Sequence, residues 1–221
     1  MKILFKLSLM VFLLGFLASC GPKGEKAGAG EAGEVAEETG KEYAVNAANS
    51  KIMWEGSKVT GSHNGTVEIS DGSIAMEDGT LTGGSFTIDM STIEDEDLDG
   101  DMKANLENHL KGTVEGKETD FFNVPKYPTA KFEITKATKL MNNDDANYIV
   151  YGNLTLKDVT KEISFRANVN EVNGQIKVNT PQFTIDRTEW GIKYGSAKFF
   201  DGLKDKAIAE EIGLKVDLTA G

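Results

Sequence analysis

The chain has 221 residues, and its 35 acidic and 24 basic side chains give a formal net charge of −11, which argues against nucleic acid as a partner. One cysteine and two histidines leave little material for disulfides or for thiolate and imidazole metal sites. The length fits one domain better than two.

The N-terminus has the pattern of a secretion signal. Lys2 and Lys6 accompany an apolar run over residues 7–17, which is short for a membrane helix of roughly 20 apolar residues. The sequence Leu-Ala-Ser-Cys ending at Cys20 resembles the bacterial lipobox, whose cysteine is acylated and becomes the first mature residue. We predict a lipoprotein signal peptide over residues 1–19 and a lipid anchor at Cys20. The alternative is an ordinary cleaved signal with an incidental cysteine.

The next segment, residues 20–41, consists mainly of Gly, Ala, Glu and Lys with almost no bulky apolar side chain. Such a composition buries too little surface to offset the entropy of ordering, so we predict a flexible tether. From residue 42 to residue 220 the pattern changes to strands, and we predict one folded domain there.

Alternation of apolar and polar residues dominates this domain. Ile163, Phe165, Ala167 and Val169 are separated by polar residues, and the same period of two recurs near Trp54, Ile69, Phe86, Phe132, Leu154, Val178 and Leu214. Each strand therefore has one apolar face for the core and one polar face for solvent, which is typical of antiparallel sheets.

Turn residues agree with this interpretation. Asp71-Gly72, Asp78-Gly79 and Asn173-Gly174 each separate two strand-like runs and favour hairpin turns. Gly83-Gly84 interrupts a strand where the apolar parity changes, which predicts a bulge or a bend.

One segment has helical spacing. Over residues 101–111, Met102, Leu106 and Leu110 fall on one side, and Gly112 follows as a helix terminator. The fold class that we predict is all-β and mainly antiparallel: an extended, lipocalin-like, eight-stranded β-barrel with one or two short helices. A barrel of this size is either filled by side chains or holds one small ligand, and composition does not choose between these outcomes.

Five sequence pieces, in order, resemble the YceI-like domain family, a lipocalin-like polyisoprenoid-binding family. They are SKIMWEGSK at 50–58 with HNG at 63–65; FTIDM at 86–90 with Ile93; NHL at 108–110 with DFFNV at 120–124 and YPTAKF at 127–132; GNLTLKDVTK at 152–161; and RTEWGI at 187–192. The resemblance covers roughly residues 42–220. Asp158 and Trp190 depart from the family pattern, which normally has glycine and phenylalanine at these positions.

The resemblance implies a barrel with an elongated apolar cavity for an isoprenoid chain, either a quinone tail or a polyprenyl chain. The side chains expected to line it are Trp54, Phe86, Ile88, Phe132, Leu154, Phe165 and Phe183. For any one of them alone, filling the core is the simpler interpretation.

The residues after the predicted helix are candidates for the cavity mouth. Phe121, Phe122 and Tyr127 could form a lid or merely plug the barrel end, and the plug is slightly favoured because adjacent aromatics usually anchor a loop. Arg187 could contact a polar head group or form a structural ion pair.

Two metal hypotheses fail on spacing. His63 and His109 lack ligand neighbours at the usual intervals, and a capping or hydrogen-bonding role fits them better. Residues 95–101 imitate the first half of an EF-hand loop, but Leu106 occupies the position of the bidentate glutamate. We therefore expect a solvated acidic loop, with no metal site and no cofactor other than a bound lipid.

Catalytic patterns are also missing from the sequence: G-x-S-x-G, S-x-x-K, H-E-x-x-H and phosphate-binding glycine motifs. We predict a non-enzymatic envelope lipoprotein, in the periplasm or on the cell surface, that is held by Cys20 and binds an isoprenoid lipid for storage, transport or sensing. The alternatives are a packed barrel acting as an interaction or stress module and, third, an enzyme on a small envelope metabolite. Oligomeric state stays open.

Overall fold

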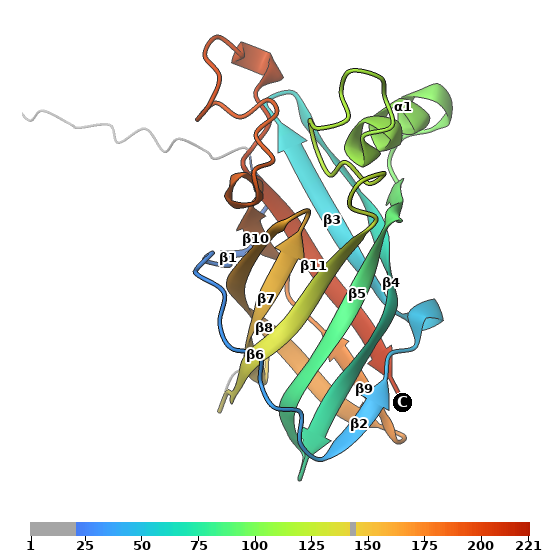
Figure 1. Cartoon of the computed structure of the whole chain (residues 1–221), viewed down its shortest axis with the longest axis vertical. Coiled ribbons are helices and arrows are strands. Elements are labelled where there is room, and N and C mark those ends of the chain that lie inside the picture. The colour runs from blue at the N-terminus through green and yellow to red at the C-terminus, as the bar shows by residue number, and fades with distance from the viewer. Residues whose placement is uncertain (1–20, 142–144) are drawn as a thin grey trace, which may run out of the picture.

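Eight antiparallel strands form a closed barrel in the computed structural model, which describes residues 21–141 and 145–221 (Figure 1). The strands, each paired with the next, are β3 (Lys51–Lys58), β4 (Gly61–Glu77), β5 (Thr80–Asp95), β6 (Thr129–Lys139), β7 (Tyr148–Leu156), β8 (Val159–Val172), β9 (Gln175–Asn179) and β11 (Glu211–Ala220). Because β11 pairs with both β3 and β9, the sheet closes into a barrel. The predicted fold class is confirmed.

The period of two in the sequence places apolar side chains inside the barrel. In β8, Ile163, Ala167 and Val169 are buried, while the neighbouring Asn170 is exposed. Two hairpin predictions are confirmed, because both central residues of Asp78-Gly79 and of Asn173-Gly174 have positive φ. This backbone is the type I′ turn that matches the twist of paired strands.

The third hairpin prediction is wrong. Asp71 and Gly72 lie within the long strand β4, at a register shift against β5. Gly72 has a φ of 152°, and a side chain there would meet the carbonyl oxygen of Ser85. The dipeptide therefore serves a bulge. The irregularity predicted near Gly83-Gly84 is present, since the pairing of β4 with β5 shifts by one residue at Thr82.

Among the described residues, the α-helix α1 (Gly100–Lys111) covers one end of the barrel, and three 3₁₀ turns accompany the strands: η1 (Ala47–Asn49), η2 (Arg187–Trp190) and η3 (Lys204–Lys206). Gly112 ends α1 in the left-handed conformation, as predicted, with a φ of 73°. We call the end carrying α1, the β3–β4 turn and residues 191–210 the open end (Figure 1).

The opposite, closed end is filled by side chains. Its interior contains Ile74, Leu81 and Tyr148. The Tyr148 hydroxyl accepts a hydrogen bond from the Leu81 N–H at 3.3 Å and lies 3.4 Å from the carbonyl oxygen of Gly79, the turn residue between β4 and β5. A buried tyrosine with both hydrogen bonds satisfied thus seals this end.

The structure differs from the predicted flexible tether over the residues that it describes, 21–41. Here β1 (Glu25–Lys26) pairs in parallel with β10 (Phe183–Asp186), a strand that also pairs with β11. Gly30 then exchanges two backbone hydrogen bonds with Glu162 of β8. The segment thereby lies between the edges of β10 and β8, and Ala27 is only 3% exposed.

Beyond this seam the segment crosses the outside of the barrel (Figure 1). The Asn153 side chain of β7 donates to the carbonyl of Gly33 at 2.8 Å and accepts from its N–H at 2.9 Å. Ala36 donates to Ile134 of β6, and β2 (Lys41–Ala44) pairs with β4. Small residues allow such close backbone approach, which offsets the missing apolar bulk.

The predicted signal peptide (1–19) and Cys20 lie outside the described residues. Within the described ranges, none of the helices has both the length and the apolar character needed to cross a membrane.

Candidate functional site

An apolar cavity of about 330 Å³ occupies the barrel interior on the side of the open end. Its walls come from strands on all sides of the barrel. All seven side chains that were predicted to line a cavity do line it: Trp54, Phe86, Ile88, Phe132, Leu154, Phe165 and Phe183. The barrel is therefore hollow at this end, and the fully packed alternative is wrong for this half of the interior.

Four phenylalanine rings form the cavity floor. Phe86 lies 5.2 Å from Phe132, which lies 5.4 Å from Phe165, in centroid distance. Phe165 in turn stacks on Phe183 at 4.5 Å with nearly parallel planes. The first three also border a void of only about 30 Å³ on their other side, toward the closed end. The row thus separates the cavity from the packed half of the barrel.

Gly152 of β7 makes room for this floor. It pairs with Ile134, the second residue after Phe132 on β6. A Cβ atom at Gly152 would overlap the Phe132 ring and lie 2.7 Å from the carbonyl oxygen of Glu133. The absence of a side chain here lets the ring lie against the β7 backbone.

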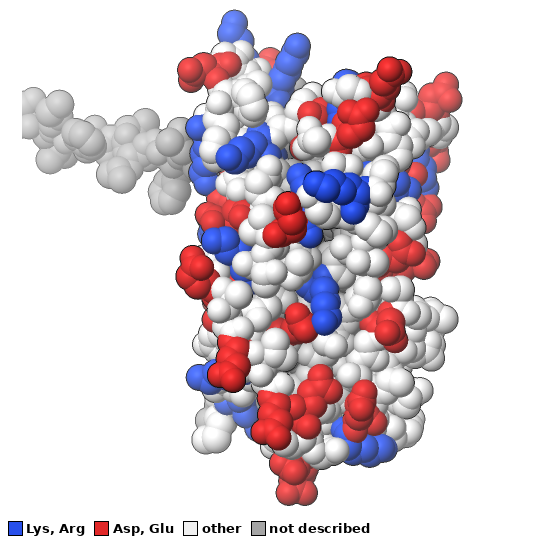
Figure 2. Space-filling view, viewed as in Figure 1, with Lys and Arg blue, Asp and Glu red and all other residues white. Residues whose placement is uncertain are grey.

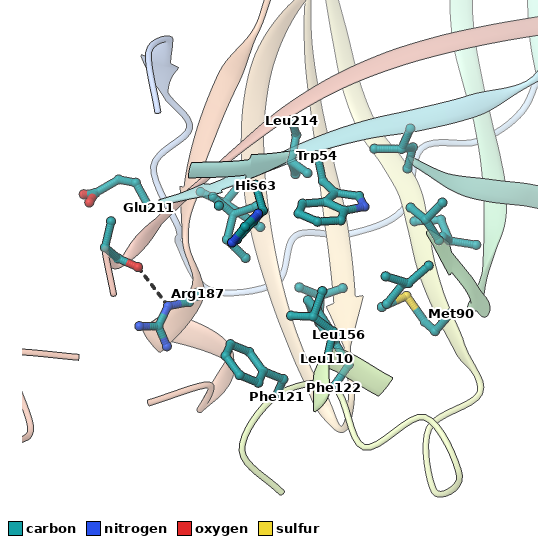
Figure 3. A pocket seen from close by; sticks show the side chains of 18 of the residues that line it. Trp54, His63, Met90, Leu110, Phe121, Phe122, Leu156, Arg187, Glu211 and Leu214 are labelled. Carbon is teal, nitrogen blue, oxygen red and sulfur yellow. Dashed lines mark hydrogen bonds between the residues drawn. The ribbon is translucent and has the colours of Figure 1, made fainter. Parts of the chain in front are cut away.

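Aromatic side chains surround the mouth (Figure 3). Phe121 and Phe122 line the cavity together with Leu110 of α1, facing Trp54 and Leu214 across it. Both phenylalanines therefore lie where the sequence predicted a lid or plug.

His109 and Tyr194 complete this cluster. The His109 ring makes T-shaped contacts with the rings of Phe121 and Tyr194, each at a centroid distance of 5.0 Å. Tyr127, in contrast, does not belong to the mouth, and this prediction is wrong. Its hydroxyl donates to Asp158 at 3.0 Å in an exposed contact outside the cavity.

Arg187 is the buried cation of the cavity wall, with only 1% exposure. Its guanidinium donates to three backbone carbonyls, those of Ile192 at 2.8 Å, Ala209 at 2.9 Å and Ile208 at 3.2 Å. Burial lowers its pKa, although an arginine stays charged. These carbonyl contacts hold the 191–210 segment in place. Arg187 therefore has a structural role, which differs from both the ion pair and the head-group contact expected from the sequence.

Part of the polar lining lies on one side of the cavity. In Figure 3, Arg187 and Glu211 lie on the opposite side from Met90, with His63 between them, and His109 adds a further polar side chain to the lining. The cavity is thus apolar in depth with a polar edge, an arrangement that suits an amphipathic ligand.

Both histidines make the hydrogen bonds expected of them. His109 Nε2 lies 2.7 Å from Asp120 Oδ2, and His63 Nδ1 lies 3.0 Å from Asp97 Oδ2. Both rings also line the cavity, a role that the sequence did not suggest. His63 lies at the polar start of β4 and His109 lies on α1, so no alternation along a strand indicated that either ring faces the cavity.

The expectation of a solvated acidic loop is wrong for Asp95. This residue pairs with Gly65 of β4 and is fully buried. Its Oδ1 accepts from the N–H groups of Asp97 and Leu98 at 3.2 and 2.7 Å. Burial raises the pKa of the Asp95 carboxyl group, and the neighbouring Asp97 carboxylate adds to the increase.

Comparison with known proteins identifies the family. The family model described as the YceI-like domain matches residues 43–220, most of the chain. The chain belongs to the YceI-like domain family. Among curated relatives, a UPF0312 protein of Photorhabdus laumondii is 31% identical over 119 residues, covering 47% of this chain and 60% of the relative. A UPF0312 protein of Pseudomonas putida is 38% identical over 89 residues, covering 39% and 45%.

Two solved structures share the barrel fold of this chain. Burkholderia cenocepacia BcnA superposes with a TM-score of 0.60 at 20% identity, over 80% of this chain and 99% of BcnA. A polyisoprenoid binding domain from Saccharophagus degradans gives 0.55 at 13% identity, over 85% and 98%. At these identities the likeness establishes the barrel fold and leaves the ligand to be argued from the cavity.

Proposed function

We propose that this YceI-like protein binds an isoprenoid-type lipid, a quinone or a polyprenyl chain, in the cavity and stores, carries or senses it. The observation that carries the proposal is the apolar cavity of about 330 Å³ above the phenylalanine floor. The polyisoprenoid-binding description of the Saccharophagus degradans domain supports it.

Hydrocarbon burial provides the affinity in this proposal. Each methylene removed from water contributes about 0.8 kcal/mol, so a few isoprene units suffice without any specific polar contact. The cavity volume lies near the lower end of the roughly 300–1,000 Å³ range of small-molecule pockets. One end of a prenyl chain would therefore fill it, and the rest of a long chain would leave through the mouth.

The head group would lie at the polar edge beside His63 and Glu211, while the nearby Arg187 guanidinium stays bound to backbone carbonyls. Acidic and basic side chains are interspersed on the face shown in Figure 2, and the net charge of the chain is −11. This charge opposes a diphosphate head group, which favours a neutral lipid such as a quinone.

We further propose that the protein is anchored to a membrane of the bacterial envelope through acylated Cys20, with the open end near the bilayer. Pro22, near the start of the described chain, packs against Gly213 beside the cavity wall. Five of the eight exposed large apolar side chains among the described residues lie at this end: Val59, Met102, Tyr194, Phe199 and Phe200. Exposed aromatics near lysines are typical of surfaces that touch lipid headgroups.

The lipid is tested by organic extraction and mass spectrometry of protein purified from its native host. We expect a prenyl lipid in near-equimolar amount. Leu214→Trp, which fills the cavity mouth, should lose the lipid, whereas Val172→Trp, on an exposed edge at the closed end, should keep it. Repeated extractions without lipid from the folded wild-type protein would refute the proposal.

The anchor is tested separately by Cys20→Ala and membrane fractionation. We expect the variant to leave the membrane fraction or to accumulate as unprocessed precursor. Normal processing with unchanged membrane attachment would contradict acylation at Cys20 without affecting the lipid-binding proposal.

A further inference from the structure

The cluster formed by His63, Asp95 and Asp97 has the composition of a metal site. Each residue offers one ligand atom, and the three atoms lie within 4.8 Å of one another. It is the one such group of three or more His, Cys, Asp or Glu side chains within residues 21–141 and 145–221. His63 comes from β4, whereas the two carboxylates come from the end of β5 and the connection to α1.

The second observation is an oxygen atom without a partner. Asp95 is 0% exposed, and its Oδ2 is the single buried side-chain polar atom without a hydrogen bond in the described part of the chain. Leaving a buried carboxylate oxygen unpaired is costly, so such an atom calls for an explanation. A bound cation beside it would supply the missing partner.

The neighbouring contacts hold the group in place. Asp97 Oδ1 accepts from the Asn64 N–H at 2.8 Å, and Glu107 of α1 accepts from the Asp95 N–H at 3.0 Å. Lys103, the nearby cation, is already paired with Glu94 at 2.6 Å. Backbone N–H groups thus orient both aspartate side chains, and Asp97 in turn holds the His63 ring, which is how proteins orient metal-binding side chains.

We propose that His63, Asp95 and Asp97 bind a divalent transition-metal ion, such as Zn²⁺, at the rim of the cavity. One imidazole and two carboxylates suit Zn²⁺ or Mn²⁺ better than Ca²⁺, which prefers an all-oxygen shell. The 3.0 Å between His63 Nδ1 and Asp97 Oδ2 fits two ligands that each lie about 2.0–2.1 Å from one ion.

The ion would have a structural consequence and an open position. It would join β4 to the β5–α1 connection and so fix α1 over the cavity. Because the His63 and Asp97 side chains are 31% and 32% exposed, water can complete the coordination. Three protein ligands with one solvent position is a common arrangement for zinc.

The test is calorimetric titration of the purified, chelator-treated protein with ZnCl₂. We expect one Zn²⁺ per chain, with a raised melting temperature in its presence. Asp95→Asn and His63→Gln should each weaken binding by at least roughly tenfold. Asp95→Asn keeps the Oδ1 acceptor for Asp97 and Leu98, so it should stay folded, and circular dichroism checks this.

Asp120→Asn is the matched control. It breaks the other histidine–carboxylate pair with the same change of charge, but no third carboxylate stands beside that pair among the described residues. Zinc affinity should be unchanged in this variant. No saturable binding to the wild-type protein, or equal binding by folded Asp95→Asn and His63→Gln variants, would overturn the proposal.

Discussion

The two ends of the barrel use the same strands, yet one encloses about 330 Å³ and the other only about 30 Å³. At the closed end Ile74, Leu81 and Tyr148 are buried in the core, and the Tyr148 hydroxyl binds the Leu81 N–H. At the open end the row from Phe86 to Phe183 stops the packing, and the walls above it remain apart. A continuous apolar strand face can therefore serve as core over half its length and as a binding surface over the other half.

A matched pair of truncations, one at each end of the barrel, should have the largest effect on stability. Ile134→Ala, at the packed end, should lower the free energy of unfolding by about 2–5 kcal/mol, because it leaves a cavity. Ile88→Ala, in the wall of the open cavity, should cost roughly 1 kcal/mol less, since its side chain already faces fewer neighbours. Urea denaturation of lipid-free protein measures both. Equal losses would mean that the open end is packed as densely as the closed end.

Substitutions at two glycines test whether the cavity floor is rigid. Gly152→Ala should destabilise the protein by about 1–3 kcal/mol, because the new methyl group overlaps Phe132 and displaces the floor. In Gly56→Ala, in the wall of β3, the methyl group meets nothing within 4 Å, so stability should stay within about 1 kcal/mol of wild type. Thermal melting compares the two variants. A Gly152→Ala protein as stable as Gly56→Ala would show that the floor is deformable.

The smallest effect concerns pH at the open end. The raised pKa of Asp95 means that the folded protein holds this proton more tightly than the unfolded chain, in which an aspartate has a pKa of about 3.9. Stability from this group is therefore full below that pH and is lost as pH rises through the folded-state pKa.

Asp95→Asn removes this dependence. In chelator-treated protein at pH 7 the variant should melt higher than wild type, by about 2–4 °C for each kcal/mol gained, and the difference should vanish below about pH 4. Melting curves across this range measure it. A lower melting temperature for the variant at pH 7 would show that the ionised carboxylate stabilises the metal-free fold.

Sequence patterns predicted the barrel and the cavity wall because both depend on the alternation of apolar residues along strands. Phe86, Phe132 and Phe165 had to point inward by parity alone. Parity does not say how far inward-facing side chains fill the interior, because that depends on register between strands, such as the pairing of Phe86 with Phe132. The division into open and closed ends was therefore beyond the sequence.

The errors fall where periodicity is lacking. Tyr127 lies in a connection, where no repeat fixes the direction of a side chain. Asp95 was expected in solvent because of its acidic neighbours, yet its pairing with Gly65 buries it. The segment 21–41 lacks bulky apolar residues, but its backbone hydrogen bonds to Thr184, Glu162 and Ile134 hold it on the barrel.

That segment gives the proposed anchor an unusual place in the molecule. With acyl chains on Cys20, the membrane attachment would continue directly into backbone that supplies the missing neighbour for both β10 and β8. A cut between Lys26 and Gly30 would, under this proposal, separate the barrel from its anchor and the two strand contacts from each other in a single event.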